Sequence, residues 1–273
     1  MDKYKVDYHI HTTYSDGHST PTDIIKKAKD QGYDIIAITD HDNVDGIPEA
    51  MAAAEAVELK VIPGLEIAAE TEEGLGLHIL GYNIDLDSEE LKSFLKQLIV
   101  NREDRNTRLF EALQETGYDV SLEDVEIGKN SFVGKPLIAD ALVRKGYITD
   151  KKQAFGPEIM GSEKLRQVKK AKPSAKDAIE AIIKAGGTPV LAHPIQIRGM
   201  GEPGSEEFFA NADKLIGRLR KQGLKGLECF HPDHSEEQSM RFVEIAEKYH
   251  LHITAGSDFH GEDYMHVDKT ENE

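Results

Sequence analysis

The sequence contains a single cysteine, Cys229, so no disulfide can form within the chain. Because disulfides are typical of secreted proteins, their absence favours a reducing compartment, and the cytoplasm is the expected location. The N-terminal residues carry charges but no apolar core, which argues against a secretory signal. The sequence also lacks an apolar run as long as a membrane-spanning helix, about 20 residues, so no membrane association is expected.

Basic residues are also fewer than acidic ones: the sequence has 33 Lys and Arg against 50 Asp and Glu, which gives a net charge of −17. A surface with this excess of negative charge repels nucleic acid, so a stable nucleic-acid complex is not expected. The segment from Arg102 to Lys172 is different, with 14 basic and 12 acidic residues, whereas the rest of the chain has 19 and 38. This segment could offer cations to an anionic ligand, although mixed charge is also ordinary on solvated helices.

Apolar runs alternate with amphipathic stretches in the first and last thirds of the chain, which predicts an α/β fold with a parallel sheet or barrel. Residues 88–172 read instead as helices joined by polar connections. We therefore expect a barrel formed by residues 1–100 and 173–273, with residues 101–172 as a helical insertion domain. The predicted strands are residues 4–9, 34–39, 59–63, 65–70, 77–82, 188–192, 226–230 and 252–255, and the helices of the barrel part are residues 20–31, 47–57, 175–185, 213–222 and 236–249.

Histidines and carboxylates gather where the predicted strands end. His9 and His11 are two residues apart, so an extended backbone places both imidazoles on one side. The carboxyl ends of parallel barrel strands open onto one face, where active sites lie, and residues far apart in sequence would meet there. The set consists of His9, His11, Asp16, Asp40, His41, Glu66, His78, His193, Asp258 and His260.

Imidazole and carboxylate ligands suit divalent ions such as Zn²⁺, Mn²⁺ and Fe²⁺. Such ions generate hydroxide from water at neutral pH and neutralise the charge that builds on a phosphoryl group. Each member alone has a simpler explanation: Asp16 as a turn former before Gly17, Asp40 as a helix cap, and His78 as a strand residue that points away. Together the residues indicate a metal-dependent phosphoesterase.

Six segments of the sequence resemble, in order, the signature segments of the PHP (polymerase and histidinol phosphatase) superfamily. The similarity covers nearly the whole chain and is closest to the nucleoside 3′,5′-bisphosphate phosphatases and the related 5′–3′ exoribonuclease. It implies a distorted (β/α)7 TIM-like barrel with a helical insertion. The segments are His9-Ile-His11, Asp16-Gly17, Thr39-Asp40-His41, Pro63-Gly64-Leu65-Glu66, His193-Pro194 and Gly256-Ser-Asp258-Phe-His260.

The resemblance implies three divalent metal ions per chain (Mn²⁺, Zn²⁺ or Fe²⁺). Asp40 is expected to orient a ligand rather than bind an ion, and attack by a metal-activated hydroxide is expected to hydrolyse the phosphate ester. His9, His11, Glu66 and Asp258 would hold the first ion and form the catalytic set. Glu66, His78 and His193 would hold the second ion, and Asp16, His41 and His260 the third.

The resemblance extends into the insertion, where Gly134-Lys135-Pro136-Leu137-Ile138-Ala139 is similar to a Gly-Arg-Pro-His-Ile-Ala segment of this branch. Here Lys135 replaces the arginine, and a lysine lacks the bidentate fork of a guanidinium. We expect Lys135, Arg102, Arg105 and His234 to bind the substrate, a small phosphorylated molecule such as a nucleotide or short RNA.

Three other functions remain open from the residues. A histidinol-phosphate-type phosphatase is a member of the same superfamily, but nothing in the sequence selects an imidazole substrate. An amidohydrolase-like hydrolase of carbon–nitrogen bonds uses a similar barrel, but typically needs a carbamylated lysine at a strand end, and none is well placed. A non-catalytic metal-binding regulator would be expected to lack ligands, whereas this set is complete.

Overall fold

The computed structural model describes residues 4–126 and 133–261. The chain divides into two compact units, one formed by Met1–Leu95 with Pro173–Glu273 and the other by Lys96–Lys172. The first boundary lies within helix α3 (Glu89–Glu115), slightly before the residue 100 expected from the sequence. Each unit has a hydrophobic core of its own.

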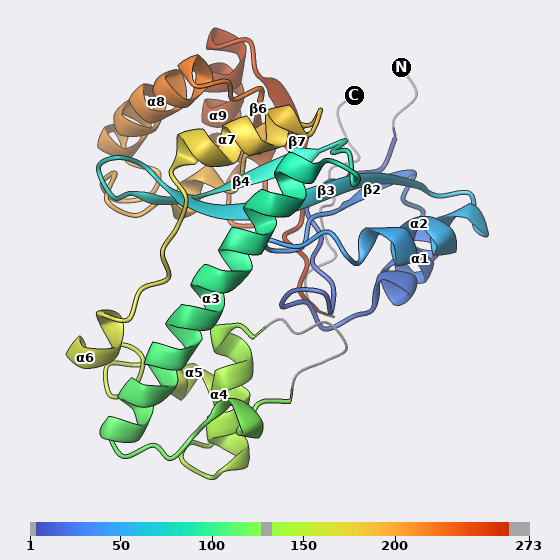
Figure 1. The fold of residues 1–273 in the computed structure, drawn as a ribbon. Helices are drawn as coiled ribbons and strands as arrows, with labels where there is room; N and C mark the ends of the chain where they lie inside the picture. The colour runs from blue at the N-terminus through green and yellow to red at the C-terminus, as the bar shows by residue number, and fades with distance from the viewer. Residues whose placement is uncertain (1–3, 127–132, 262–273) are drawn as a thin grey trace. The chain divides into compact units, whose positions relative to one another are not determined.

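Seven strands form one sheet in the order of the chain, and the sheet almost closes into a barrel (Figure 1). Neighbouring strands are parallel, except that β4 is antiparallel to both β3 and β5. The Tyr8 amide donates to the Ala255 carbonyl at 3.0 Å, which links the first strand to the last. The predicted α/β barrel is therefore confirmed. The strands are β1 Val6–Asp7, β2 Ile35–Ile38, β3 Lys60–Glu70, β4 Gly76–Tyr82, β5 Thr188–Leu191, β6 Gly226–Phe230 and β7 His252–Ala255.

The helices of this unit begin at capping side chains that the sequence provides. Thr20 and Ser174 each accept a hydrogen bond from the third helical amide, and Ser235 forms a capping box with Gln238. Helix α7 packs against β3, β4 and β5, and α9 packs against β6 and β7. The helices are α1 Pro21–Asp30, α2 Ile47–Glu55, α7 Ala175–Lys184, α8 Glu206–Lys221 and α9 Glu236–Lys248.

Within its described residues the second unit contains helices joined by turns, and no β-strand. It contains most of α3, followed by the 3₁₀ turn η1 Leu122–Asp124, α4 Lys135–Arg144, α5 Lys151–Ala154 and α6 Glu163–Arg166. Its core joins buried residues of these helices, including Leu113, Ile138 and Leu165. Because its apolar residues find partners within the segment, this unit buries a core without using the barrel.

Three predicted element boundaries were wrong, and those of β3 and α8 have a local cause. Residues 59–63 and 65–70 form the single strand β3, because the strand pairs with β2 up to Pro63 and with β4 from Gly64 onward. Proline lacks an amide hydrogen, and the change of partner occurs where that hydrogen is dispensable. Strand β1 is shorter than residues 4–9. Helix α8 begins at Glu206 rather than at residue 213, because Ser205 caps it and Phe208 is buried.

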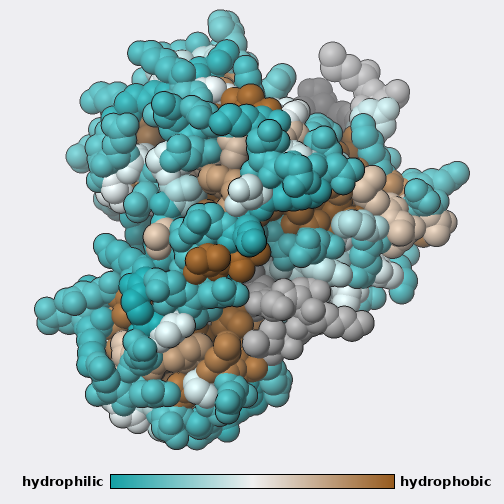
Figure 2. Space-filling view, in the orientation of Figure 1, coloured by the Kyte–Doolittle hydropathy of each residue, from teal (hydrophilic) through white to brown (hydrophobic). Residues whose placement is uncertain are grey.

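The surface agrees with the polar composition of the chain. The face drawn in Figure 2 is largely hydrophilic, as expected for a chain with 30% charged residues. Among residues 4–126 and 133–261, no helix combines the length and the apolar character that a membrane span requires.

Candidate metal centre

Glu66 lies at the centre of the predicted site and is 1% exposed. Its carboxylate is surrounded by imidazole nitrogens at distances between 2.9 and 3.3 Å. Ligand atoms that share one ion at about 2.1 Å stand about 3 to 3.4 Å from one another, so this spacing fits donors arranged around ions. Glu66 Oε1 faces His78 Nδ1 (3.0 Å), His193 Nε2 (3.1 Å) and His9 Nε2 (3.3 Å), and Oε2 faces His41 Nδ1 (2.9 Å) and His11 Nε2 (3.3 Å).

Two aspartates extend this arrangement on either side. Asp258 Oδ1 lies 3.4 Å from His9 Nε2 and 3.2 Å from His11 Nε2. Asp16 Oδ1 lies 3.3 Å from His260 Nε2. All nine predicted ligands therefore come together, and their donor atoms form overlapping groups that could each hold an ion. These groups are His9, His11 and Asp258; His9, Glu66 and His193; His41, Glu66 and His78; and His11, Asp16, His41 and His260.

The barrel brings these side chains together from the ends of its strands. His9 and His11 lie just after β1 and are fully buried on one side of the backbone, while Ile10 between them bridges to Phe259. Glu66 was expected to follow the strand at residues 59–63 but lies inside β3, which continues through it. His78 lies inside β4, within the strand predicted at residues 77–82. His78 still reaches the same site because β4 runs opposite to its neighbours.

The backbone is strained at several site residues. Positive φ angles, which residues other than glycine rarely adopt, occur at His193 (23°), at Asp258 (53°) and at Asp42 (49°), the residue after His41. Such strain is concentrated at functional sites, where the surrounding structure holds it in place.

The charges of the cluster are strongly coupled. Burial opposes ionisation of Glu66, but the surrounding histidines, His78 foremost, hold its pKa well below the usual range. Burial likewise disfavours a charged His41, yet Glu66 and Asp16 outweigh it and raise the pKa of His41 to about 10. Without ions, the carboxylates of the cluster are thus stabilised by nearby imidazoles, among them a protonated His41, and divalent cations can take over this role.

Several donor atoms at the centre are buried and have no hydrogen-bond partner, including His9 Nε2, His11 Nε2 and Glu66 Oε2. A buried polar atom without a hydrogen-bond partner costs free energy. Several such atoms in one cluster therefore need an explanation. Metal coordination would satisfy them, and both the donor types and the spacing fit divalent ions.

Asp40, expected from the resemblance to orient a ligand, belongs to none of the groups of possible metal ligands. It is 1% exposed and accepts hydrogen bonds from the Thr12 amide and hydroxyl, each at 2.7 Å, and from the Ser15 hydroxyl. These bonds tie down the loop that carries Asp16.

Two buried carboxylates beside the cluster were missed from the sequence. Glu228 on β6 lies 3.1 Å from His9 Nδ1, and Asp7 on β1 accepts from the Ser257 amide at 2.9 Å. An acid within an apolar strand was the available signal for each, since ionisable groups are rarely buried without a purpose.

The predicted substrate residues fall into different parts of the chain. His234 lies after β6, is 8% exposed, and its ring is 5.6 Å from that of His231. His231 in turn lies 3.7 Å from Asp258. Arg102, Arg105 and Lys135 belong to the helical unit, where both arginines are 7% exposed.

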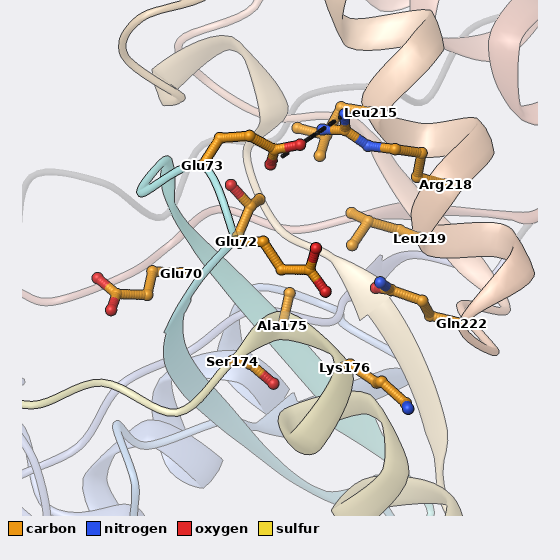
Figure 3. A pocket seen from close by; sticks show the side chains of 11 residues that line it. Glu70, Glu72, Glu73, Ser174, Ala175, Lys176, Leu215, Arg218, Leu219 and Gln222 are labelled. Carbon is orange, nitrogen blue, oxygen red and sulfur yellow. Dashed lines mark hydrogen bonds and ion pairs between the residues drawn. The ribbon is translucent and has the colours of Figure 1, made fainter.

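A hollow of about 100 Å³ elsewhere on the barrel unit is a poor candidate for the chemistry (Figure 3). Residues of the β3–β4 turn and of helices α7 and α8 line it, and Glu73 pairs there with Arg218 at 2.8 Å. None of the nine ligands lines this hollow.

A family model for the PHP domain matches residues 7–188, more than half of the chain. The chain belongs to the PHP family. This match confirms the resemblance found in the sequence.

Individual PHP relatives are similar over almost the full length of the chain. A 5′-3′ exoribonuclease of Haemophilus influenzae is 31% identical over 94% of this chain and 90% of its own. A 3′,5′-nucleoside bisphosphate phosphatase of Chromobacterium violaceum is 29% identical over 97% of this chain and 91% of its own. A solved structure from Bifidobacterium adolescentis, assigned as a metal-dependent phosphoesterase, has 30% identity and a TM-score of 0.83 over 97% of this chain and 91% of that one.

Family membership and the cluster around Glu66 agree with each other. This PHP protein is a metal-dependent phosphoesterase, and its histidine and carboxylate groups are able to bind the metal.

Proposed function

We propose that this PHP protein hydrolyses phosphate esters of nucleotides, either a nucleoside 3′,5′-bisphosphate or a 5′-phosphorylated oligonucleotide. The observation that carries the proposal is that five imidazole nitrogens lie within 3.3 Å of the buried carboxylate of Glu66. The similarity to the exoribonuclease and the bisphosphate phosphatase supports the nucleotide class. The sparse cysteine content supports a cytoplasmic location.

The proposed donor set would hold three ions of the Mn²⁺, Zn²⁺ or Fe²⁺ type. Such ions, when bound, supply hydroxide at neutral pH and neutralise charge on the phosphoryl group. Glu66 links the three sets, because its two oxygens face ligands of each. The sets are His9, His11, Glu66 and Asp258; Glu66, His78 and His193; and Asp16, His41 and His260.

Cations of the helical unit are proposed to bind an anionic part of the substrate. Burial, together with the charges of the neighbouring Arg102 and Arg108, lowers the pKa of Arg105 to about 10. Lys135 has a lowered pKa for the same reasons, burial first and then Arg105. Arg105 Nε is buried without a hydrogen-bond partner. Cations crowded in this way repel one another, so a phosphate group beside them would be bound favourably.

His234 is proposed to contact a substrate hydroxyl rather than a phosphate oxygen. Its Nδ1 lies 2.9 Å from the Cys229 carbonyl, so this nitrogen is assigned the hydrogen and donates it. Burial lowers the pKa of His234 to about 4, so the ring is neutral and Nε2 is an acceptor. An acceptor suits a sugar hydroxyl and repels an anion.

The test is phosphate release by the purified protein with added Mn²⁺. The panel contains adenosine 3′,5′-bisphosphate, 5′-AMP, a short 5′-phosphorylated RNA and histidinol phosphate. We expect selective release from the bisphosphate or the RNA, and a loss of at least about 100-fold in the His9→Ala/His11→Ala variant, which lacks two ligands. The His252→Ala variant, altered at an exposed histidine of β7, is the matched control and should keep wild-type rates.

Preferential turnover of histidinol phosphate would contradict the nucleotide assignment. Turnover that survives loss of both histidines would contradict the assignment of the centre itself.

A further inference from the structure

We propose that Glu228 is a positioning residue that holds two metal ligands, His9 and His193, in their binding geometry. The carboxylate is fully buried on β6. Its Oε1 lies 3.1 Å from His9 Nδ1, and its Oε2 accepts the His193 amide at 2.7 Å. One side chain therefore joins ligands that follow β1 and β5. The inference rests on the metal centre proposed above, but it does not depend on the substrate.

The bond to His9 determines which ring nitrogen faces the centre. A carboxylate can only accept, so Nδ1 carries the hydrogen and donates it to Glu228. Nε2 then points at Glu66 and Asp258, at 3.3 and 3.4 Å, and supplies the lone pair for an ion. A carboxylate behind a ligating imidazole fixes the tautomer and the ring orientation, and it raises the basicity of the ligand.

The bond to His193 acts on the backbone. His193 has a φ angle of 23°, a conformation that is unfavourable for a residue with a Cβ atom. Because its amide donates to Glu228 at 2.7 Å, the carboxylate stabilises this conformation and thereby directs the side chain, whose Nε2 lies 3.1 Å from Glu66. Losing the acceptor would leave a buried amide without a partner at a strained position.

The surroundings of Glu228 fit this role better than a purely structural one. A fully buried carboxylate is costly unless each oxygen is bonded. The neighbouring buried carboxylates Asp7 and Asp40 bond backbone amides and hydroxyl groups. Glu228 also bonds the ring of a predicted ligand. Gly256 packs so closely that a Cβ there would stand 2.5 Å from Glu228 Oε1, which keeps the carboxylate in one place.

The decisive variant is Glu228→Gln, which keeps the size of the side chain but replaces one acceptor with a donor. The two short bonds use different oxygens of the carboxylate, and a glutamine offers only one oxygen, so one of the two short bonds is lost. Cys229→Ala is the matched control, because Cys229 is the next residue of β6 and is equally buried. Its loss disturbs packing without touching either ligand.

Three quantities are measured without any substrate: Zn²⁺ affinity by competition with a chelating dye, ions per chain by elemental analysis, and the histidine tautomers by ¹⁵N NMR. We expect Glu228→Gln to weaken the affinity of one ion by about 10- to 100-fold and to change the nitrogen signature of His9. The Cys229→Ala control should lower the midpoint of thermal unfolding but keep the wild-type Zn²⁺ affinity and the wild-type nitrogen signature of His9. Glu228→Asp, which retains two acceptors on a shorter arm, should restore part of the affinity.

Wild-type affinity and an unchanged His9 signature in Glu228→Gln would overturn the proposal. An equal loss of affinity in Cys229→Ala would also overturn it, since packing of β6 would then be the cause. If Glu228→Gln does not fold, Glu228→Asp decides: full wild-type affinity and signature there would count against a positioning role. None of these measurements depends on phosphate release. Failure of the nucleotide proposal would appear only in the substrate panel and would leave the metal affinities unchanged.

Discussion

The two oxygens of Glu66 face more imidazoles than one carboxylate can bond. A carboxylate offers about four lone-pair positions, whereas five ring nitrogens lie within 3.3 Å of it. Direct contacts at 3.0, 3.1 and 2.9 Å account for His78, His193 and His41, while His9 Nε2 and His11 Nε2 stay without a hydrogen-bond partner. Ions between these atoms would satisfy all of them, which is why the excess of nitrogens argues for more than one ion.

His234 makes a prediction about acid stability at the residue scale. Burial lowers its pKa to about 4 in the folded state, against about 6.5 when unfolded. The neutral ring therefore stabilises the fold fully above pH 6.5, and this stability is lost as the pH falls toward 4. Between pH 7 and pH 5 the free energy of unfolding of the metal-free protein should fall by about 2 kcal/mol less in His234→Gln than in the wild type, because glutamine does not titrate. Urea unfolding at the two pH values measures this difference.

The control for this prediction is His252→Gln, because the side chain of His252 is exposed. This variant should keep the wild-type slope of stability with pH. Equal slopes in wild type and His234→Gln would show that His234 is accessible to protons in the folded state.

At the scale of elements, the segment after β7 is tightly fitted against the start of the barrel. A Cβ on Gly256 would stand 2.3 Å from His9 Cβ and 2.5 Å from Glu228 Oε1. We therefore expect Gly256→Ala to displace the His9–Glu228 pair, with a loss of about 1–3 kcal/mol in stability and at least about tenfold in metal affinity. Thermal unfolding and dye competition measure the two effects.

Gly261→Ala serves as the matched control for this segment. A Cβ at Gly261 would approach His18 no closer than 3.8 Å, which is an ordinary contact. If both variants bind metal as tightly as the wild type, the close fit around Gly256 has no role in the centre.

The sequence predicted the barrel because its strands and helices alternate, and the ligands because they lie near strand ends. It predicted Glu66 as a ligand but placed it after a strand, since Pro63-Gly64 looks like a break when the change of strand partner is not visible. Glu228 could not be matched to His9 from the sequence, because the two are 219 residues apart and only the closed barrel joins them. The proximity of the two cations Arg105 and Lys135 likewise could not be predicted from the sequence, because it results from the packing of the helical unit.

The charge of the whole molecule suits a protein that collects cations. The net charge is −17, and outside Arg102 to Lys172 there are 38 acidic against 19 basic residues. An acidic surface raises the local concentration of divalent cations and repels anionic polymers. The more balanced charge of the helical unit is the exception, and this unit carries the cations proposed to bind substrate.

Metal binding to the whole protein should release protons. Burial opposes the charge on His41, but Glu66 and Asp16 raise its pKa to about 10, so the metal-free protein carries this proton at pH 7. An imidazole must be neutral to bind a metal, so Zn²⁺ must displace it. Calorimetric titration with Zn²⁺ at pH 7, in buffers with different ionisation enthalpies, should give enthalpies that depend on the buffer and correspond to at least about one proton per chain.

The His41→Gln variant separates this proton from others, because it removes the titrating ring and leaves the remaining ligands in place. It should release about one proton fewer than the wild type on binding Zn²⁺. Enthalpies that do not depend on the buffer in the wild type would mean that His41 is already neutral at pH 7. The pairing with Glu66 at 2.9 Å would then be a neutral hydrogen bond, and the charge balance of the metal-free centre would need a different donor.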